Sequence, residues 1–142
     1  MIVDANVLLF AVDESPRFHE SARACLEGAM NGVERVGLPW VSLVAFQRIV
    51  THPRVTAPPL TAEDAWNHVT DWLDTAQAWV PTPGARHRDI IGSLLISGDL
   101  RGNFVTDVDL AALAIEHGVG ICSYDSDFAR FEGLRWVNPS GS

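Results

Sequence analysis

Five short apolar segments, separated by helical patterns, limit what this chain can fold into. The segments are Met1–Asp4, Val36–Leu38, Ala78–Val80, Gly120–Tyr124 and Leu134–Val137. Short strands that alternate with helices are typical of units whose strands pair in parallel, because a parallel connection must cross over the sheet. The alternation therefore predicts an α/β domain with a central, mostly parallel, five-stranded sheet.

Helical patterns occupy most of the intervening chain. Ala5–Val12 is apolar and is compatible with a helix, and apolar residues recur at helical spacing from Phe18 to Asn31, with Pro16 suited to a first turn. Further helices are expected over Val41–Val50, from Thr61 to Leu73, over His87–Leu100 and over Thr106–His117. His52–Leu60 contains three prolines and is expected to be a connecting loop.

The length of 142 residues suits a single domain, with residues 1–137 as its core and 138–142 as a loose tail. The tryptophans are expected to serve packing, with Trp40 and Trp136 in the core.

Cys25 and Cys122 form no paired motif. No apolar run approaches the ~20 residues of a membrane span, and no signal peptide is recognised. We therefore expect a cytoplasmic protein that does not enter the membrane.

The charge balance restricts the possible functions. The chain has 10 basic and 18 acidic residues, and its net charge of −8 argues weakly against a broad basic surface for nucleic acid. A carboxylate cluster that binds a divalent cation would neutralise part of that charge. All the basic residues are arginine, which excludes a P-loop. A phosphatase of the haloacid-dehalogenase type is excluded too, since it needs a lysine and a second Asp where Asn6 stands.

Acidic residues follow two of the predicted strands and begin the helix between them. Asp4 ends the first strand, Asp125 and Asp127 follow the fourth, and Asp107 begins the helix that leads into the fourth. Sites in open parallel sheets form at the carboxyl ends of strands, so these side chains are expected at one edge. Mg²⁺ and Mn²⁺ prefer carboxylate oxygens, and phosphodiester hydrolysis uses such an ion to activate water. The pattern predicts a metal-dependent hydrolase.

Each acid also has a structural alternative. Asp4 could form a turn after its strand, and Asp125 and Asp127 could cap or turn the chain. Asp107 and Asp109 follow Thr106, a possible helix N-cap, and acids in a first turn are stabilised by the helix dipole without any metal. The prediction rests on the joint arrangement of the acids and on a resemblance that further motifs carry.

Three motifs, in this order, make the chain resemble a known family. They are Ile2-Val3-Asp4-Ala5-Asn6, Thr106-Asp107-Val108-Asp109-Leu110-Ala111-Ala112-Leu113-Ala114, and Ser123-Tyr124-Asp125-Ser126-Asp127-Phe128. Together with Gly102-Asn103 and the closing segment 131–139, they resemble the PIN domain of VapC-type ribonuclease toxins. The resemblance runs essentially from end to end.

The resemblance implies both a fold and an activity. The fold would be a three-layer α/β/α sandwich, and the activity that of an endoribonuclease dependent on Mg²⁺, with Mn²⁺ able to substitute. It implies a homodimer, a cognate VapB-like antitoxin, and cleavage of structured RNA such as tRNA, which would inhibit translation. Carried over by position, Asp4 and Asp107 would be the main metal ligands, Asp125 would complete the cluster, and Asp127 would join them as a catalytic residue.

One stretch departs from the family pattern. Most members have a glutamate in the helix after the second strand, but Val41–Arg48 contains no acid, and the family position falls near Phe46 or Gln47. Gln47 could offer a neutral oxygen and Ser42 a hydroxyl, and Asn6 and Asp109 are further possible neighbours of the cluster. The departure keeps open an alternative function, a PIN-fold protein–protein interaction module with little catalysis.

Arginine and histidine side chains are candidates for contacts with the substrate. Arg48, Arg54, Arg86 and His87 could bind phosphates, for which the planar donor fork of arginine is suited. The alternative is that they are ordinary surface or packing residues.

Overall fold

The computed structural model describes residues 1–14, 17–56 and 58–141, so Pro16 lies outside the described residues. Its elements follow in the order β1 (Ile2–Val3), α1 (Ala5–Val12), α2 (His19–Met30), β2 (Val36–Gly37), α3 (Trp40–Val50), α4 (Ala62–Leu73), β3 (Ala78–Trp79), α5 (His87–Ser97), α6 (Phe104–Glu116), β4 (Ile121–Cys122), the 3₁₀ helix η1 (Ser126–Arg130) and β5 (Trp136–Val137). Among the described residues, no helix is long and apolar enough to cross a membrane.

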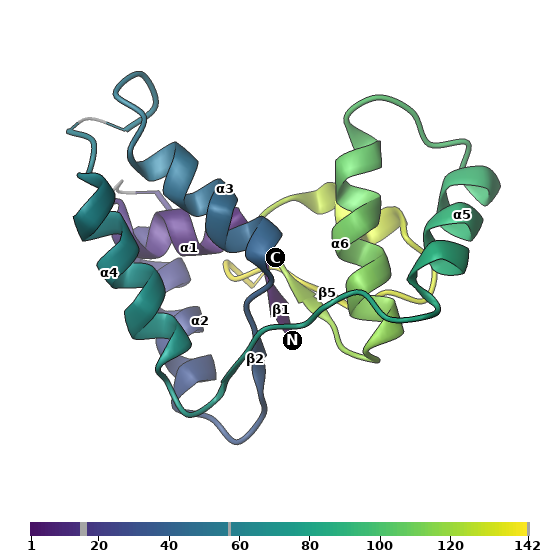
Figure 1. Ribbon diagram of the computed structural model, residues 1–142, viewed down its shortest axis with the longest axis horizontal. Helices are drawn as coiled ribbons and strands as arrows, with labels where there is room; N and C mark the ends of the chain where they lie inside the picture. The colour runs from purple at the N-terminus through teal and green to yellow at the C-terminus, as the bar shows by residue number, and fades with distance from the viewer. Residues whose placement is uncertain (15–16, 57, 142) are drawn as a thin grey trace.

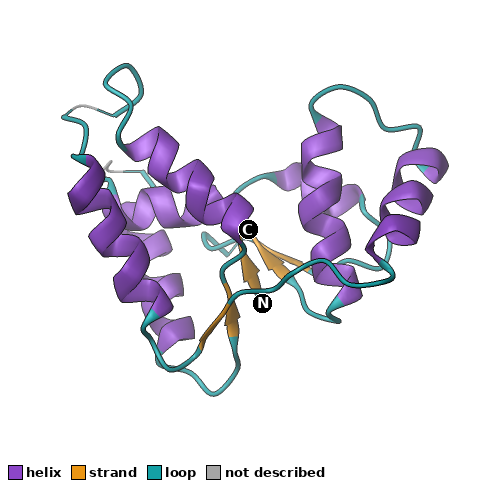
Figure 2. Ribbon diagram, viewed as in Figure 1, coloured by secondary structure: helices purple, strands orange, loops and turns teal. Residues whose placement is uncertain are grey.

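The strands form one five-stranded sheet in the order β3-β2-β1-β4-β5. Figure 2 shows the strands in the middle of the molecule, between two groups of helices. All four pairings are parallel, which confirms the predicted sheet. β1 is the central strand, with Ile2 opposite both Gly37 of β2 and Ile121 of β4. The strand order changes direction between β1 and β4, and sites in open α/β sheets form at such a point.

Helices cover both faces of the sheet, as in a three-layer sandwich. Figure 1 shows α1–α4 on one side of the strands and α5 and α6 on the other. Neighbouring strand residues point to opposite faces, so Val3 and Cys122 pack into the cluster beneath α1–α4 while Ile2 and Ile121 pack beneath α6. The near-continuous apolar character of the strands follows from this burial on both faces.

Local signals set several helix ends. Thr61 caps α4, because its side chain accepts a hydrogen bond from the Asp64 amide at 3.1 Å. The prediction that Thr106 caps the helix now labelled α6 is wrong, since α6 begins two residues earlier at Phe104. The Thr106 hydroxyl instead donates to the Asn103 carbonyl at 2.9 Å. This start places Asp107 in the first turn of α6.

The prediction that Trp40 lies in the core is also wrong. Its side chain is 46% exposed and stacks against Trp66, which is equally exposed, with ring centroids 6.2 Å apart. Val41 and Val44 of the same helix are 53% and 60% exposed. The opposite face of α3 carries Leu43, Phe46 and Val50, which are buried. Helix α3 is therefore apolar on both faces, and a pattern of apolar residues does not tell which face is covered.

Phe46 ties α3 to α4. Its ring is fully buried and meets the Trp72 ring edge-on, with centroids 4.9 Å apart. We expect Phe46→Ala to lower the free energy of unfolding by about 3–5 kcal/mol, because it removes a buried ring and leaves a cavity. Urea denaturation measures this change. Val44→Ala, on the exposed side of the same helix, should stay within about 0.5 kcal/mol of the parent. A loss at Phe46 no larger than that of the control would show that the ring does not hold the two helices together.

Candidate metal centre

Two acids of the site follow adjacent parallel strands. Asp4 follows β1 and caps α1, with its Oδ1 accepting from the Ala5 amide at 2.8 Å. Asp125 follows β4 and caps η1, with its Oδ1 accepting from the Asp127 amide at 2.9 Å. Both caps use one carboxylate oxygen locally. Each of these two acids therefore has a structural role at the start of a helix. Each carboxylate keeps a second oxygen for other partners.

Three carboxylates meet at this edge of the sheet. One oxygen each of Asp107, Asp125 and Asp127 lies within 4.8 Å of the other two, and all three residues are partly buried. Asp107 comes from α6, while Asp125 and Asp127 come from the start of η1, which packs against α6. We call these three residues the acid cluster. Asp4 is not one of the three, although the sequence placed it among the metal ligands.

Ser123 connects Asp4 to the acid cluster. Its hydroxyl donates to Asp4 Oδ2 at 2.7 Å and accepts from the Asp125 amide at 3.0 Å. Asn6 completes the connection: its Nδ2 donates to the Ser123 hydroxyl at 3.1 Å, and its Oδ1 accepts from the Tyr124 amide at 3.2 Å. Ser123 itself is fully buried. Asp4 and Asp125 are thus held in fixed relation through a serine at the end of β4.

The electrostatics of the site oppose its own ionisation. Burial, together with the charges of Asp125, Asp4 and Asp127, raises the pKa of Asp107 to about 6, against a smaller lowering by Arg130. Burial also raises the pKa of Asp4, partly offset by the hydrogen bonds from Ser123 and Ala5. In an acid with only a structural role in a helix's first turn, the helix dipole would stabilise the charged form and lower the pKa. Here desolvation and like charges outweigh any such gain at Asp107.

The residues fit a hard divalent cation. The cluster offers carboxylate oxygens from three side chains at a spacing that one ion can bridge, and oxygen is the donor that Mg²⁺ and Mn²⁺ prefer. A bound cation would supply the positive charge that the crowded carboxylates lack. Exposed acids often gather without any ion, but these are partly buried, and one has a raised pKa. The donor set therefore suits a metal centre.

The α3 residues near the expected position of the family glutamate have other roles in the structure. Phe46 is part of the hydrophobic core, and the Gln47 amide donates to the Ala62 carbonyl at the start of α4 at 3.0 Å. The Ser42 hydroxyl is buried and has no hydrogen-bond partner among the described residues. Gln47 is thus tied to a neighbouring helix, and its Oε1 is buried without a partner in the described part of the chain.

The other candidates have partners outside the acid cluster. The Asp109 carboxylate accepts a hydrogen bond from His87 Nε2 at 2.8 Å, where α5 meets α6. The Arg86 guanidinium donates to the Glu116 carbonyl at 2.8 Å, and the Glu116 carboxylate accepts from the amides of Gly84 and Arg86. These contacts fasten the loop before α5 onto the end of α6. Arg48 is exposed on α3.

Sequence reasoning did not single out Ser123 and Arg130. Ser123 stands inside the motif that carries Asp125, directly after a strand, and this position was a signal that it could reach the neighbouring strand's acid. Arg130 stands three residues after Asp127, within the same short helix. No spacing rule marks either residue, because their partners lie on other elements.

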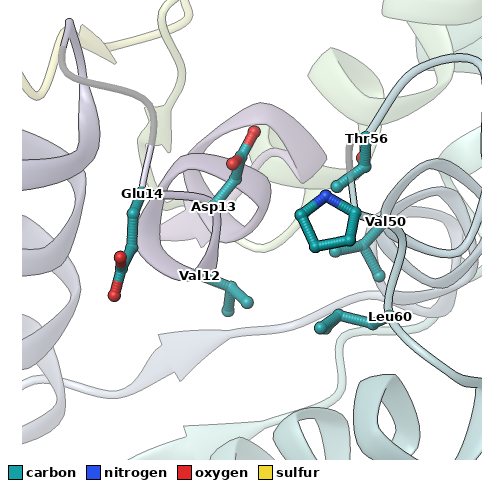
Figure 3. A pocket seen from close by; sticks show the side chains of 7 residues that line it. Val12, Asp13, Glu14, Val50, Thr56 and Leu60 are labelled. Carbon is teal, nitrogen blue, oxygen red and sulfur yellow. The ribbon is translucent and has the colours of Figure 1, made fainter.

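A separate cavity lies away from these acids. Figure 3 shows the residues that line it, at the end of α1 and in the loop after α3. The volume of the cavity is about 490 Å³. Val12, Val50 and Leu60 form apolar walls, and Asp13 and Glu14 add carboxylates. None of the acid-cluster residues lines it, so cavity size does not locate the candidate site in this protein.

Comparison with known proteins identifies the family. A model of the PIN domain matches residues 1–134. The chain belongs to the PIN-domain family. Among its relatives, ribonuclease VapC37 of Mycobacterium tuberculosis is 46% identical over 138 residues, which cover 97% of this chain and 96% of the relative. Ribonuclease VapC33 of the same organism is 41% identical over 139 residues, covering 98% and 97%.

A solved structure shows the same fold. The crystal structure of VapBC2 from Rickettsia felis, bound to a DNA fragment from their promoter, matches with a TM-score of 0.69 and 20% identity over 96% of both chains. The predicted family, VapC-type PIN domains, is thereby confirmed together with its sandwich fold. Of the three predicted metal ligands of this PIN domain, Asp107 and Asp125 stand in the acid cluster and Asp4 does not.

The raised pKa of Asp107 predicts how pH changes the stability of the metal-free PIN domain. The folded-state value of about 6 exceeds the ordinary 3.8, so the folded state holds the proton more tightly than the unfolded chain. Stability is therefore lost as pH rises from about 4 through about 6. Asp107→Asn removes the charge permanently. We expect it to raise Tm in EDTA at about pH 7.5, and to change Tm little at about pH 4.

Thermal melts at the two pH values, in EDTA, measure this difference. Asp71→Asn, which changes an exposed acid on α4, is the matched control and should show no such pH dependence. An Asp107→Asn variant that melts at or below the parent temperature at about pH 7.5 would show that Asp107 is a stabilising first-turn acid, as in the dipole interpretation.

Proposed function

We propose that this protein is a Mg²⁺- or Mn²⁺-dependent endoribonuclease, the toxin of a VapBC-type toxin–antitoxin pair. The observation that carries the proposal is the acid cluster, whose oxygens from Asp107, Asp125 and Asp127 lie within 4.8 Å of one another. Its relatives named ribonuclease VapC, matched along nearly the whole chain, support RNA as the substrate. We further propose a structured RNA such as tRNA, cut in a loop where single-stranded bases are accessible.

The residues of the site have distinct roles in this mechanism. Asp107, Asp125 and Asp127 would hold the cation, and Asp4, positioned by Ser123, would complete its surroundings and orient the attacking water. When bound, the ion supplies the Lewis acidity that activates water and offsets charge on the phosphate in the transition state. The raised pKa of Asp107 matters here, because a proton competes with the cation for this carboxylate as pH falls through about 6.

Partners follow from the same family. We propose that a VapB-like antitoxin inhibits the enzyme in the cytoplasm, and the fold that the chain shares with the VapBC2 structure supports such a partner. We also propose, from the family resemblance alone, that the toxin forms a homodimer. The exposed apolar residues Trp40, Val41 and Val44 of α3, with Trp66 of α4, offer a surface for a protein partner. The same surface, and the absence of an acid on α3, favour the second candidate function, a PIN-fold interaction module with little catalysis.

Cleavage of RNA tests the proposal directly. We expect purified, antitoxin-free protein to cut a species in a total RNA pool when Mg²⁺ or Mn²⁺ is present, and not in EDTA. Asp107→Asn and Asp4→Asn should each lower the cleavage rate by about a hundredfold or more, because a carboxylate that supports the cation is lost. Asp71→Asn serves as the control and should cleave like the parent.

Two outcomes would contradict the nuclease. Cleavage that persists in EDTA or in both site variants would come from another source or another site. Folded protein that binds Mn²⁺ but cuts no RNA would favour the interaction module.

Ser123 provides a second test, with binding rather than cleavage as its readout. Ser123→Ala removes the hydrogen bond to Asp4 and the acceptor of the Asp125 amide. We expect about ten- to a hundredfold weaker Mn²⁺ binding by calorimetry, since groups that orient metal ligands have effects of this size. Ser97→Ala, which changes an exposed serine near the end of α5, is the control. Unchanged Mn²⁺ affinity in Ser123→Ala would show that Asp4 and Asp125 need no such support.

A further inference from the structure

Arg130 is an exposed cation fixed beside the acid cluster. Its neighbours Phe128 and Phe131 are both buried in the core beneath α6, with exposed fractions of 1% and 5%. The backbone of Arg130 is therefore anchored on both sides, while its side chain remains exposed to solvent.

The guanidinium of Arg130 lies over the first turn of α6. Its Cζ is 4.0 Å from the centroid of the Phe104 ring, a cation–π contact. Phe104 precedes Asp107 by three residues on α6, and residues at this spacing are neighbours on one helix face. The positive charge thus stands about one helical turn from a carboxylate of the cluster.

The charge balance of the acid cluster explains why the positive charge of Arg130 is useful there in addition to a metal ion. One divalent ion would leave the three carboxylates with a net negative charge, and a phosphodiester brings another. Several other arginines are engaged elsewhere: Arg23 pairs with Glu27, Arg101 pairs with Asp99, and Arg86 donates to the Glu116 carbonyl. Arg130 instead presents its charge on an aromatic ring, and a guanidinium stacked in this way keeps its donor fork free for phosphate oxygens.

We propose that Arg130, held over Phe104, binds a phosphate of the RNA backbone next to the bond that is cut at the acid cluster. This inference rests on the proposed ribonuclease function. It assigns Arg130 to substrate positioning, because the contact would form before cleavage and persist through it.

Binding measurements test the proposal without cleavage. The probe is a fluorescein-labelled tRNA pool in EDTA, with binding followed by anisotropy. We expect Arg130→Ala to weaken binding about tenfold, and to make the dependence of log affinity on log salt shallower by about one, since one phosphate contact is lost. Arg130→Lys should keep the salt dependence but recover only part of the affinity. Arg23→Ala, which breaks an exposed ion pair on α2, is the matched control.

Kinetics and stability separate this role from a structural one. In the Mn²⁺-dependent assay, Arg130→Ala should raise KM about tenfold and change kcat by less than about threefold, because the contact is made equally in the ground and transition states. Its Tm should stay near that of the parent. A lowered Tm with an unchanged salt dependence would mean that Arg130 only supports the fold, and would overturn the proposal.

The remaining outcomes distinguish the two proposals. If the parent cleaves RNA in a metal- and Asp107-dependent way while Arg130→Ala matches it in affinity, salt dependence and KM, the ribonuclease function stands and the role of Arg130 is overturned. If the parent neither binds nor cleaves the RNA pool, the proposed function fails, and the Arg130 proposal fails with it.

Discussion

The site depends on the parallel pairing of β1 with β4. The two strands are distant in sequence, yet Ile2 lies opposite Ile121 and Val3 opposite Cys122. Because both strands run in the same direction, the residues that follow them reach the same edge of the sheet. Asp4 and Ser123 are these next residues, and the hydrogen bond between them follows from the register. A shift of one residue would send both side chains to other positions, so the core packing of Ile2 and Ile121 also sets the geometry of the acids.

The acid cluster costs stability that other parts of the fold must supply. Burial and like charges raise the pKa of Asp107, and burial does the same for Asp4. Such groups are tolerated where function requires them and the surrounding structure holds them in place. Here α6 is held by buried Val108, Ala111 and Ala114, which follow Asp107 on the same helix. The helix that carries the most perturbed acid is thus also among the best buried in the molecule.

Helix α3 illustrates how a packing role can replace a polar one. Phe46 packs between α3 and α4, and Gln47 bonds to the first residue of α4. The glutamate that the family resemblance leads one to expect falls near these two positions. A carboxylate at Phe46 would be buried among apolar groups, which is costly for a charge. The acids at the sheet edge therefore come from the end of β1 (Asp4), from the segment after β4 and from α6. Arg130 adds a fixed positive charge next to them, on a segment anchored by two buried phenylalanines.

The sequence by itself determined the parallel α/β architecture and which acids stand at strand ends, because strand length, helical spacing and motif order are local properties. It also identified the family, since three short motifs in order rarely arise together. Only the tertiary structure decided the strand order β3-β2-β1-β4-β5, and with it that Asp127 joins Asp107 and Asp125 while Asp4 is linked through Ser123. The exposure of Trp40, the engagement of Gln47 with α4 and the position of Arg130 over Phe104 were likewise decided there. The physical reason is that these features depend on contacts between residues far apart in the chain, and no local pattern of the sequence specifies which distant surfaces meet.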